Sequence, residues 1–405
     1  MRFKYTFFSL FLLLIFCKAQ EKGSLDTQLV LKCFYPVSEI KVGAENTVAY
    51  LPLLIDKKVG VVTNQTGILP SYGDEHLVDF LLAQKINVKK IFSPEHGFRG
   101  KADAGEKVKS GIDEKTGLPI ISLYGDNRKP KSSQLQDVDL ILFDLQDVGV
   151  RFYTYISTLH YVMEAAAEKG IPVIVLDRPN PNAHYIDGPM LEPALRSFVG
   201  MHEVPIVYGM TIGEYAQMIN GEKWLKNGIQ ADLTVVPLQN YTHDTPYDLP
   251  VKPSPNLPNA QSVNLYPSLC FFEGAHVSAG RGTDKQFQIY GSPYLKGETF
   301  KFVPKPNEGA KNPKFNGKTC YGEDLSHHAR LNEISLKFLL EAYKKNTKNP
   351  FFTTMGGTYW IDKLAGTPSL RKQIIAGWDE AKIKKTWQKG LEDFKKIRAK
   401  YLLYP

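Results

Sequence analysis

Carboxylates and one histidine are the side chains of this sequence best suited to chemistry, because they stand where apolar runs of the chain end. Glu95 follows Pro94, which stiffens the chain, and precedes His96. A partly buried glutamate at such a position could act as a general acid, and the neighbouring histidine could tune it or bind a ligand. Asp144 and Asp147 follow a later apolar run, and one of them is the candidate for a second catalytic carboxylate.

A pair of carboxyl groups is the usual requirement for cleaving a glycosidic bond. One group protonates the leaving oxygen, while the other activates water or attacks as the nucleophile. Glu95, His96 and Asp144 are therefore predicted to be catalytic residues. Their types leave a metal site open as an alternative, but no spacing in the sequence favours one.

The familiar catalytic signatures of other enzyme classes are missing from the sequence. It has no G-x-S-x-G nucleophile elbow, no H-E-x-x-H pair, no P-loop and no G-x-G-x-x-G segment after a predicted strand. It also has no C-x-x-C pair, so a zinc ribbon is not expected. We therefore expect neither a metal nor an organic cofactor.

Polar residues that could hold a substrate lie near the same run ends and in a later glycine-rich segment. Arg178 and Arg281 suit an acidic group, because a guanidinium pairs well with a carboxylate. Asp284 could orient Arg281, and Tyr153 could stack on a sugar ring. The other candidates for substrate binding are Asn64, Gln65, Asp147 and Asn180.

Short apolar runs alternate with helical patterns along the first part of the chain. The runs lie at 58–63, 88–92, 119–123, 138–143 and 171–176. Most of them are nearly continuously apolar, as expected for parallel strands covered on both faces, although Lys89 and Lys90 interrupt the second. Helical patterns lie at 75–84 and 154–169, and Thr211 has the capping-box spacing that starts another helix. This alternation predicts a doubly wound parallel sheet. Because the carboxyl ends of parallel strands meet at one rim, polar residues after four of the runs are expected to share an active site.

A proline-rich segment at 253–258 excludes a regular helix or central strand there and suggests a domain junction. We therefore expect a Rossmann-like α/β domain at 46–252 and a smaller α+β domain at 253–405 that completes the cleft. The second domain contains the glycine-rich segment 273–284. It is expected to end in one amphipathic helix at 379–401.

The N-terminal residues have the pattern of an export signal rather than of a folded element. A short basic start precedes an apolar run and then the small residue Ala19, so residues 1–19 are predicted to be a signal peptide. The run is shorter than the roughly 20 residues that a membrane span needs. We expect an exported, periplasmic or otherwise extracytoplasmic protein without a membrane span, and lipid attachment at Cys17 is an alternative.

The net charge of +8 is moderate, and much of it lies in the C-terminal residues. A solvated helix face accounts for this charge, and attraction to an anionic polymer is the alternative. Nucleic acid is not an expected partner, since the sequence shows no recognisable binding module. The four cysteines are too sparse to indicate a disulfide framework.

Several segments, in the right order along the chain, resemble the NamZ family of exo-β-N-acetylmuramidases. They are residues 61–67, 93–100, 143–149, 151–155, 176–181, 255–258 and 280–284. The resemblance implies a Rossmann-like domain, a smaller second domain and an active cleft between them. It also implies exo-lytic release of N-acetylmuramic acid from the non-reducing end of peptidoglycan fragments, with the family's catalytic glutamate at Glu95. The lactyl carboxylate of such muramyl sugars would give Arg178 or Arg281 a partner.

Two other functions remain open on the sequence alone. A peptidoglycan amidase or deacetylase would usually need a metal, so full activity in a chelator would argue against it. A non-catalytic muropeptide receptor would bind the sugar tightly without turnover. The second catalytic group and the oligomeric state are not fixed by the sequence.

Overall fold

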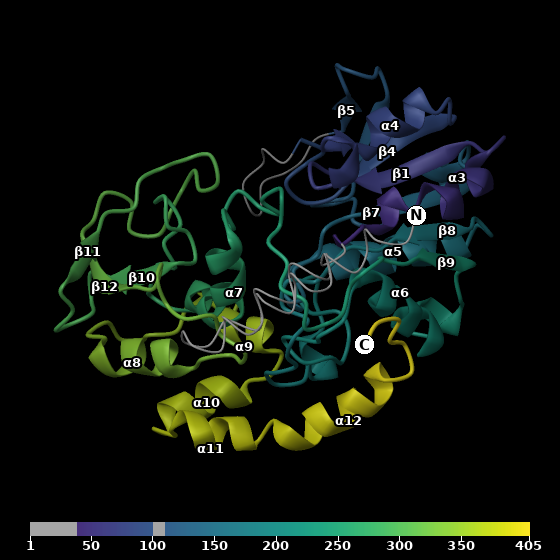
Figure 1. The fold of residues 1–405 in the computed structure, drawn as a ribbon. Helices are drawn as coiled ribbons and strands as arrows, with labels where there is room; N and C mark the ends of the chain where they lie inside the picture. The colour runs from purple at the N-terminus through teal and green to yellow at the C-terminus, as the bar shows by residue number, and fades with distance from the viewer. Residues whose placement is uncertain (1–38, 100–109) are drawn as a thin grey trace, which may run out of the picture. The chain divides into compact units, whose positions relative to one another are not determined.

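The computed structural model describes residues 39–99 and 110–405. The predicted signal peptide at 1–19 and the lipidation alternative at Cys17 lie outside the described residues. Residues 41–405 form one compact unit, whose ribbon runs from purple to yellow in Figure 1.

A seven-stranded sheet forms the first part of this unit, in the order β5-β6-β4-β1-β7-β8-β9. All neighbouring pairs are parallel except β5 with β6. The strands are β1 (Val59–Thr63), β4 (Val88–Ser93), β5 (Gly111–Ile112), β6 (Pro119–Ser122), β7 (Leu140–Asp144), β8 (Val173–Leu176) and β9 (Leu233–Val236). The predicted doubly wound parallel sheet is therefore confirmed, and all five predicted strands are present.

Burial explains the continuous apolar runs at β1, β7 and β8. Every residue of β1, β7 and β8 is buried, so these strands are apolar along their whole length. Strand β9 lies at the sheet edge and leaves Thr234 exposed, so its apolar residues do not form a continuous run. It was missed by the sequence analysis for this reason.

Helices flank the large sheet, with a short hairpin beside it. They are α3 (Thr47–Leu54), α4 (Leu77–Ala83), α5 (Tyr155–Ala167) and α6 (Ile212–Gly221), and the hairpin is β2 (Ile68–Leu69) with β3 (Glu75–His76). The capping box predicted for α6 is present. Thr211 Oγ1 accepts the Glu214 amide proton at 3.2 Å, and Glu214 Oε2 accepts that of Thr211 at 2.9 Å.

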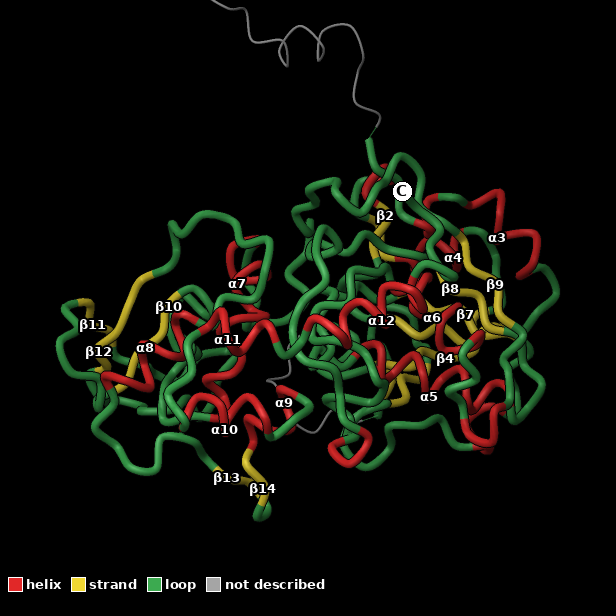
Figure 2. Tube along the Cα trace, turned by 90° about the horizontal axis from the view of Figure 1, so that it is seen from below, coloured by secondary structure: helices red, strands yellow, loops and turns green. Residues whose placement is uncertain are grey.

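The smaller C-terminal part has antiparallel sheets and helices, as predicted. Its three-stranded sheet has the order β10-β12-β11, and Figure 2 shows these strands in yellow apart from those of the large sheet. The elements are α7 (Ala260–Leu269), η6 (Cys270–Gly274), β10 (Ile289–Ser292), β11 (Phe300–Phe302), β12 (Cys320–Asp324), α8 (Lys337–Lys345), β13 (Thr354–Met355), β14 (Thr358–Tyr359), α9 (Trp360–Ala365) and α10 (Ser369–Ile375). The boundary at residues 252–253 stays a prediction.

The single C-terminal helix predicted at 379–401 is wrong, because the chain forms two helices there. They are α11 (Glu380–Lys385) and α12 (Gln388–Arg398). The Thr386 hydroxyl donates to the Ile383 carbonyl oxygen at 2.7 Å, and Trp387 is buried between the two helices in the chain. A hydroxyl that bonds a backbone carbonyl competes with the helix pattern, which fits a break at this point.

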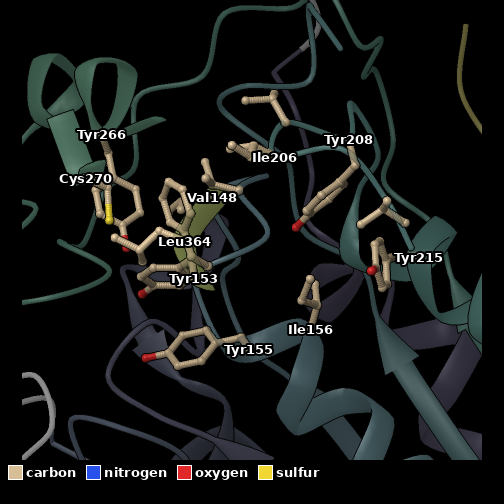
Figure 3. Packing of buried hydrophobic residues seen from close by; sticks show 14 of the residues in the cluster. Val148, Tyr153, Tyr155, Ile156, Ile206, Tyr208, Tyr215, Tyr266, Cys270 and Leu364 are labelled. Carbon is tan, nitrogen blue, oxygen red and sulfur yellow. The ribbon is translucent and has the colours of Figure 1, made fainter. Parts of the chain in front are cut away.

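One apolar core joins the two parts of the molecule. Figure 3 shows Tyr266 and Cys270 of the C-terminal part beside Tyr153 and Val148 of the sheet domain, and all four are buried. The rings of Tyr153 and Tyr266 lie 6.3 Å apart, edge to face. The cysteines Cys270 and Cys320 are buried and not bonded to each other.

Within the described ranges, every helix is too short or too polar to cross a membrane.

Candidate active site

A cavity of about 1000 Å³ is lined by residues from both parts of the molecule. Glu95, His96 and Tyr153 contribute from the large-sheet domain, and Glu273 and Arg281 contribute from the C-terminal part. Its volume lies at the upper end of the range for ligand pockets, so it has room for a sugar and its substituents.

Glu95 reaches this cavity from a sharp turn after β4. His96 and Gly97 both have left-handed backbone, with φ of 71° and 76°, and the Gly97 amide donates to the Pro94 carbonyl at 3.1 Å. Glycine adopts this conformation freely, but for histidine it costs about 1 kcal/mol. Strained backbone of this kind is found most often at functional sites. In this turn Glu95 is half-buried and His96 is buried.

Two residues at the start of α5 hold the turn in place. The Thr154 hydroxyl donates to Glu95 Oε2 at 3.0 Å, and the Tyr155 hydroxyl donates to the Glu95 carbonyl oxygen at 3.4 Å. Tyr155 in turn accepts a hydrogen bond from Asn64 Nδ2 at 2.7 Å. Asn64 is buried and outside the cavity wall, so it supports Glu95 through Tyr155.

The chain around Pro253 is anchored by two of the predicted binding residues. Tyr153 lines the cavity, and its hydroxyl donates to the Pro253 carbonyl oxygen at 2.7 Å. Gln65 Nε2 donates to the Lys252 and Pro253 carbonyl oxygens at 3.3 and 3.4 Å. Gln65 itself is not part of the cavity wall.

Asp144 and Arg178 form a buried ion pair with each other. Arg178 Nε lies 2.5 Å from Asp144 Oδ1, and Arg178 Nη2 lies 2.9 Å from Asp144 Oδ2. Arg178 also donates to the Ile68 carbonyl oxygen at 3.0 Å. Neither residue lines the cavity, so this geometry does not bring Asp144 to the carboxylate of Glu95 or Arg178 to a ligand there.

Asp147 and Asn180 are also buried outside the cavity wall. Asp147 Oδ2 accepts the Gly149 amide proton at 2.7 Å and that of the Tyr208 hydroxyl, while burial raises the pKa of Asp147 to about 6. Asn180 Nδ2 donates to the Met210 carbonyl oxygen at 2.9 Å. Both side chains therefore fix loops at the sheet's carboxyl end.

Arg281 does line the cavity, and its partner is Glu273 rather than Asp284. Arg281 Nη2 and Nε lie 2.6 and 3.1 Å from Glu273 Oε1. Burial alone would lower the pKa of Arg281, but Glu273 holds it above its usual range. Asp284 is exposed and outside the cavity wall.

Several cavity residues were missed by the sequence analysis. The cations are Arg128, Lys314 and Lys363, the aromatic side chains include Tyr124, Phe198 and Trp360, and Glu273 and Thr154 complete the polar set. Glu273 opens the glycine-rich segment 273–284, which the sequence marked without assigning a role to this residue. The cations carry no such signal, because single lysines and arginines are common on any surface.

Within residues 39–99 and 110–405, no group of three or more His, Cys, Asp or Glu side chains is placed to hold a metal ion.

Comparison with known proteins places both parts of the chain in one group. A family model described as "Exo-beta-N-acetylmuramidase NamZ, N-terminal" matches residues 59–261, and its C-terminal counterpart matches residues 264–404. The chain is 41% identical, over 373 residues, to the "Peptidoglycan beta-N-acetylmuramidase NamZ" of Bacillus subtilis (strain 168). That match covers 88% of this chain and 89% of the relative.

Two solved structures from Bacteroides fragilis NCTC 9343 are similar over nearly their whole length. Both are DUF1343 family proteins. The first has a TM-score of 0.83 and 44% identity, and covers 91% of this chain and 99% of its own. The second has a TM-score of 0.76 and 28% identity, and covers 90% of this chain and 99% of its own.

Proposed function

The chain belongs to the exo-β-N-acetylmuramidase NamZ family, and we propose that it is an exo-acting glycoside hydrolase of peptidoglycan fragments. The reaction would release N-acetylmuramic acid from the non-reducing end. The observation that carries this proposal is the half-buried Glu95, held by Thr154 on the wall of a sugar-sized cavity.

Glu95 acts in this proposal as the general acid that protonates the glycosidic oxygen. The Thr154 hydroxyl fixes the orientation of its carboxyl group, and the Tyr155 hydroxyl fixes its backbone. His96 is buried beside it and lines the same cavity, where it can bond a sugar hydroxyl. These contacts pre-organise the acid, which lowers the cost of reaching the reactive geometry.

Muramic acid carries a lactyl carboxylate, which calls for a positive charge in the cavity. Arg178 is paired with Asp144, and Arg281 is paired with Glu273. Arg128 and Lys363 line the cavity and form no ion pair with any described residue. We therefore assign the lactyl carboxylate to Arg128 and Lys363 rather than to the two arginines suggested by the sequence.

Export is part of the same proposal. Residues 1–19 have the pattern of a signal peptide, and a peptidoglycan substrate lies outside the cytoplasm. The site of action would be periplasmic or otherwise extracytoplasmic, with lipid at Cys17 as the alternative mode of retention. The mass of the mature N-terminal peptide, from the native host, distinguishes cleavage after Ala19 from a lipidated Cys17.

The decisive experiment is release of N-acetylmuramic acid from a muramyl-glucosamine disaccharide in the presence of EDTA. Wild type should turn over, and Glu95→Gln should lose about 100-fold or more in kcat, because removal of a general acid typically costs that much. Glu392→Gln is the matched control, since Glu392 is an exposed glutamate on α12. It should keep wild-type activity.

Other outcomes point to the other candidate functions. Sugar binding without turnover, unaffected by Glu95→Gln, would indicate a muropeptide receptor. Activity that appears only when EDTA is replaced by a divalent metal would indicate an amidase or deacetylase. Either result would overturn the muramidase proposal.

A further inference from the structure

Two carboxylates line the cavity among the described residues, and they come from different parts of the molecule. Glu95 follows β4 of the large sheet, and Glu273 lies in η6 of the C-terminal part. No aspartate of the described ranges lines the cavity. Asp144, the second carboxylate favoured by the sequence, is enclosed by Arg178. Glu273 is thus the carboxylate positioned to share a ligand with Glu95.

The backbone of Glu273 is fixed tightly for a residue at the end of a short helix. Lys314 Nζ donates to the carbonyl oxygens of Phe272, Glu273 and Ala275 at 2.8, 2.9 and 2.8 Å. These are carbonyls of the kind that a helix end leaves without partners. Gly274 lies so close to α9 that an added Cβ would stand 2.5 Å from the Ile361 nitrogen.

The side chain of Glu273 is held at one oxygen only. Both Arg281 nitrogens bind Oε1, and the guanidinium lies 5.1 Å from the centre of the Phe287 ring. Oε2 has no hydrogen-bond partner in the part of the chain that the structure describes. The Glu273 side chain keeps 28% of its surface exposed. A charged oxygen is therefore available to a water molecule in the cavity.

The loop that carries Arg281 depends on two glycines. Gly280 and Gly282 flank it with left-handed φ of 78° and 80°. An added Cβ on Gly282 would stand 2.7 Å from the Lys305 carbonyl oxygen and from Pro313, so only glycine fits there. The two glycines therefore fix the backbone of the loop that carries Arg281.

We propose that Glu273 is the second catalytic carboxylate, and that it activates the water that attacks the sugar. This inference rests on the proposed glycosidase function. Oε2 takes a proton from water as the water oxygen bonds to the anomeric carbon, while the bond from that carbon to the leaving oxygen breaks. Glu95 gives its proton to the leaving oxygen. Both glutamates then exchange protons with solvent and return to their starting forms, and the product has inverted configuration.

The test compares Glu273→Gln with Glu95→Gln on two substrates that differ in their leaving group. The leaving group of a 2,4-dinitrophenyl muramide departs as an anion and needs no proton. This substrate should therefore restore most of the activity of Glu95→Gln. It should not restore Glu273→Gln, whose kcat should stay about 100-fold or more below wild type with little change in KM. Glu298→Gln is the matched control, because Glu298 pairs with Lys345 at 2.6 Å outside the cavity wall. It should keep wild-type kcat.

Added azide provides a second readout, because it attacks the sugar without losing a proton. Azide should restore turnover to Glu273→Gln and give the α-glycosyl azide from a β-glycoside. Wild-type kcat in Glu273→Gln, or rescue of that variant by the better leaving group, would overturn the role of Glu273.

The anomer first released by the wild type tests the proposal without any variant, should Glu273→Gln fail to fold. An α product supports water activation by Glu273, and a β product contradicts it. Absence of turnover by folded wild type on both substrates is a different result, which contradicts the glycosidase function itself.

Discussion

At the scale of single residues, the partners of each cation decide what it can do. Arg178 is closed off by Asp144, and Arg281 is bound to Glu273. Arg128 and Lys363 line the same cavity without an ion pair in the described ranges, and the Arg128 guanidinium lies 4.5 Å from the centre of the Phe198 ring. A cation of this kind can bind an acidic substrate without first giving up a partner.

Replacing Arg128 or Lys363 by alanine should therefore raise KM for a muramyl substrate by about 10-fold or more, since a hydrogen bond to a charged group contributes roughly 1.5–3 kcal/mol. The kcat value should change little. The corresponding N-acetylglucosaminide lacks the lactyl carboxylate and serves as the control substrate, so the ratio of the two kcat/KM values is the measurement. A ratio unchanged in both variants would contradict the assignment.

At the scale of elements, the sequence predicted the strands that position the site better than the ion pairs between its side chains. Apolar runs made β1, β4, β6, β7 and β8 recognisable, and the turn after β4 led to Glu95. Continuous burial explains the runs at β1, β7 and β8. The sequence could not show that Asp144 and Arg178 neutralise each other, because ion pairing across strands depends on side-chain geometry. Glu273 was missed for the same reason: its relation to Glu95 exists only in three dimensions.

Arg151 links elements that are far apart in the chain. Its Nη1 donates to the Pro189 and Val204 carbonyl oxygens, and its Nη2 donates to those of Leu364 and Ala365 at the end of α9. Helix α9 carries Trp360 and Lys363 of the cavity wall. The fully buried Arg151 guanidinium therefore holds α9, which carries two residues of the cavity wall.

Arg151→Met should lower the free energy of unfolding by roughly 2–4 kcal/mol, because it leaves buried carbonyl oxygens without donors. Denaturant unfolding followed by tryptophan fluorescence measures this change. Arg398→Met is a milder comparison, since among the described residues Arg398 donates to the Gly209 carbonyl oxygen alone. Equal stability of Arg151→Met and wild type would show that α9 is held by its apolar contacts alone.

At the scale of the whole molecule, two buried aspartates make stability depend on pH. Burial raises the pKa of Asp147 to about 6 and that of Asp177 to about 7, although hydrogen bonds from Tyr208 and Tyr404 oppose the rise. Since the folded values exceed the unfolded value of about 4, the folded state binds more protons in this range. Stability contributed by these groups is fully present below pH 4 and is lost as the pH rises to 7.

Asp147→Asn should remove the part of this dependence that falls between pH 4 and 6. Oδ2 of Asp147 accepts two hydrogen bonds that an asparagine oxygen can also accept, and Oδ1 is buried without a partner. The midpoint of thermal unfolding, measured at several pH values, should fall less steeply from pH 4 to 6 in the variant than in wild type. Parallel curves would mean that Asp147 is charged at both ends of the range.

The shared wall of the cavity has a consequence for the timing of activity. Residues 59–261 can place Glu95 on the rim of their own sheet, but residues 264–404 supply Glu273, Arg281 and the side of the cavity that encloses a sugar. A chain in which only the first part is folded would therefore have Glu95 without the enclosed cavity. The cavity that encloses a sugar is therefore complete only when both parts are folded and packed against each other.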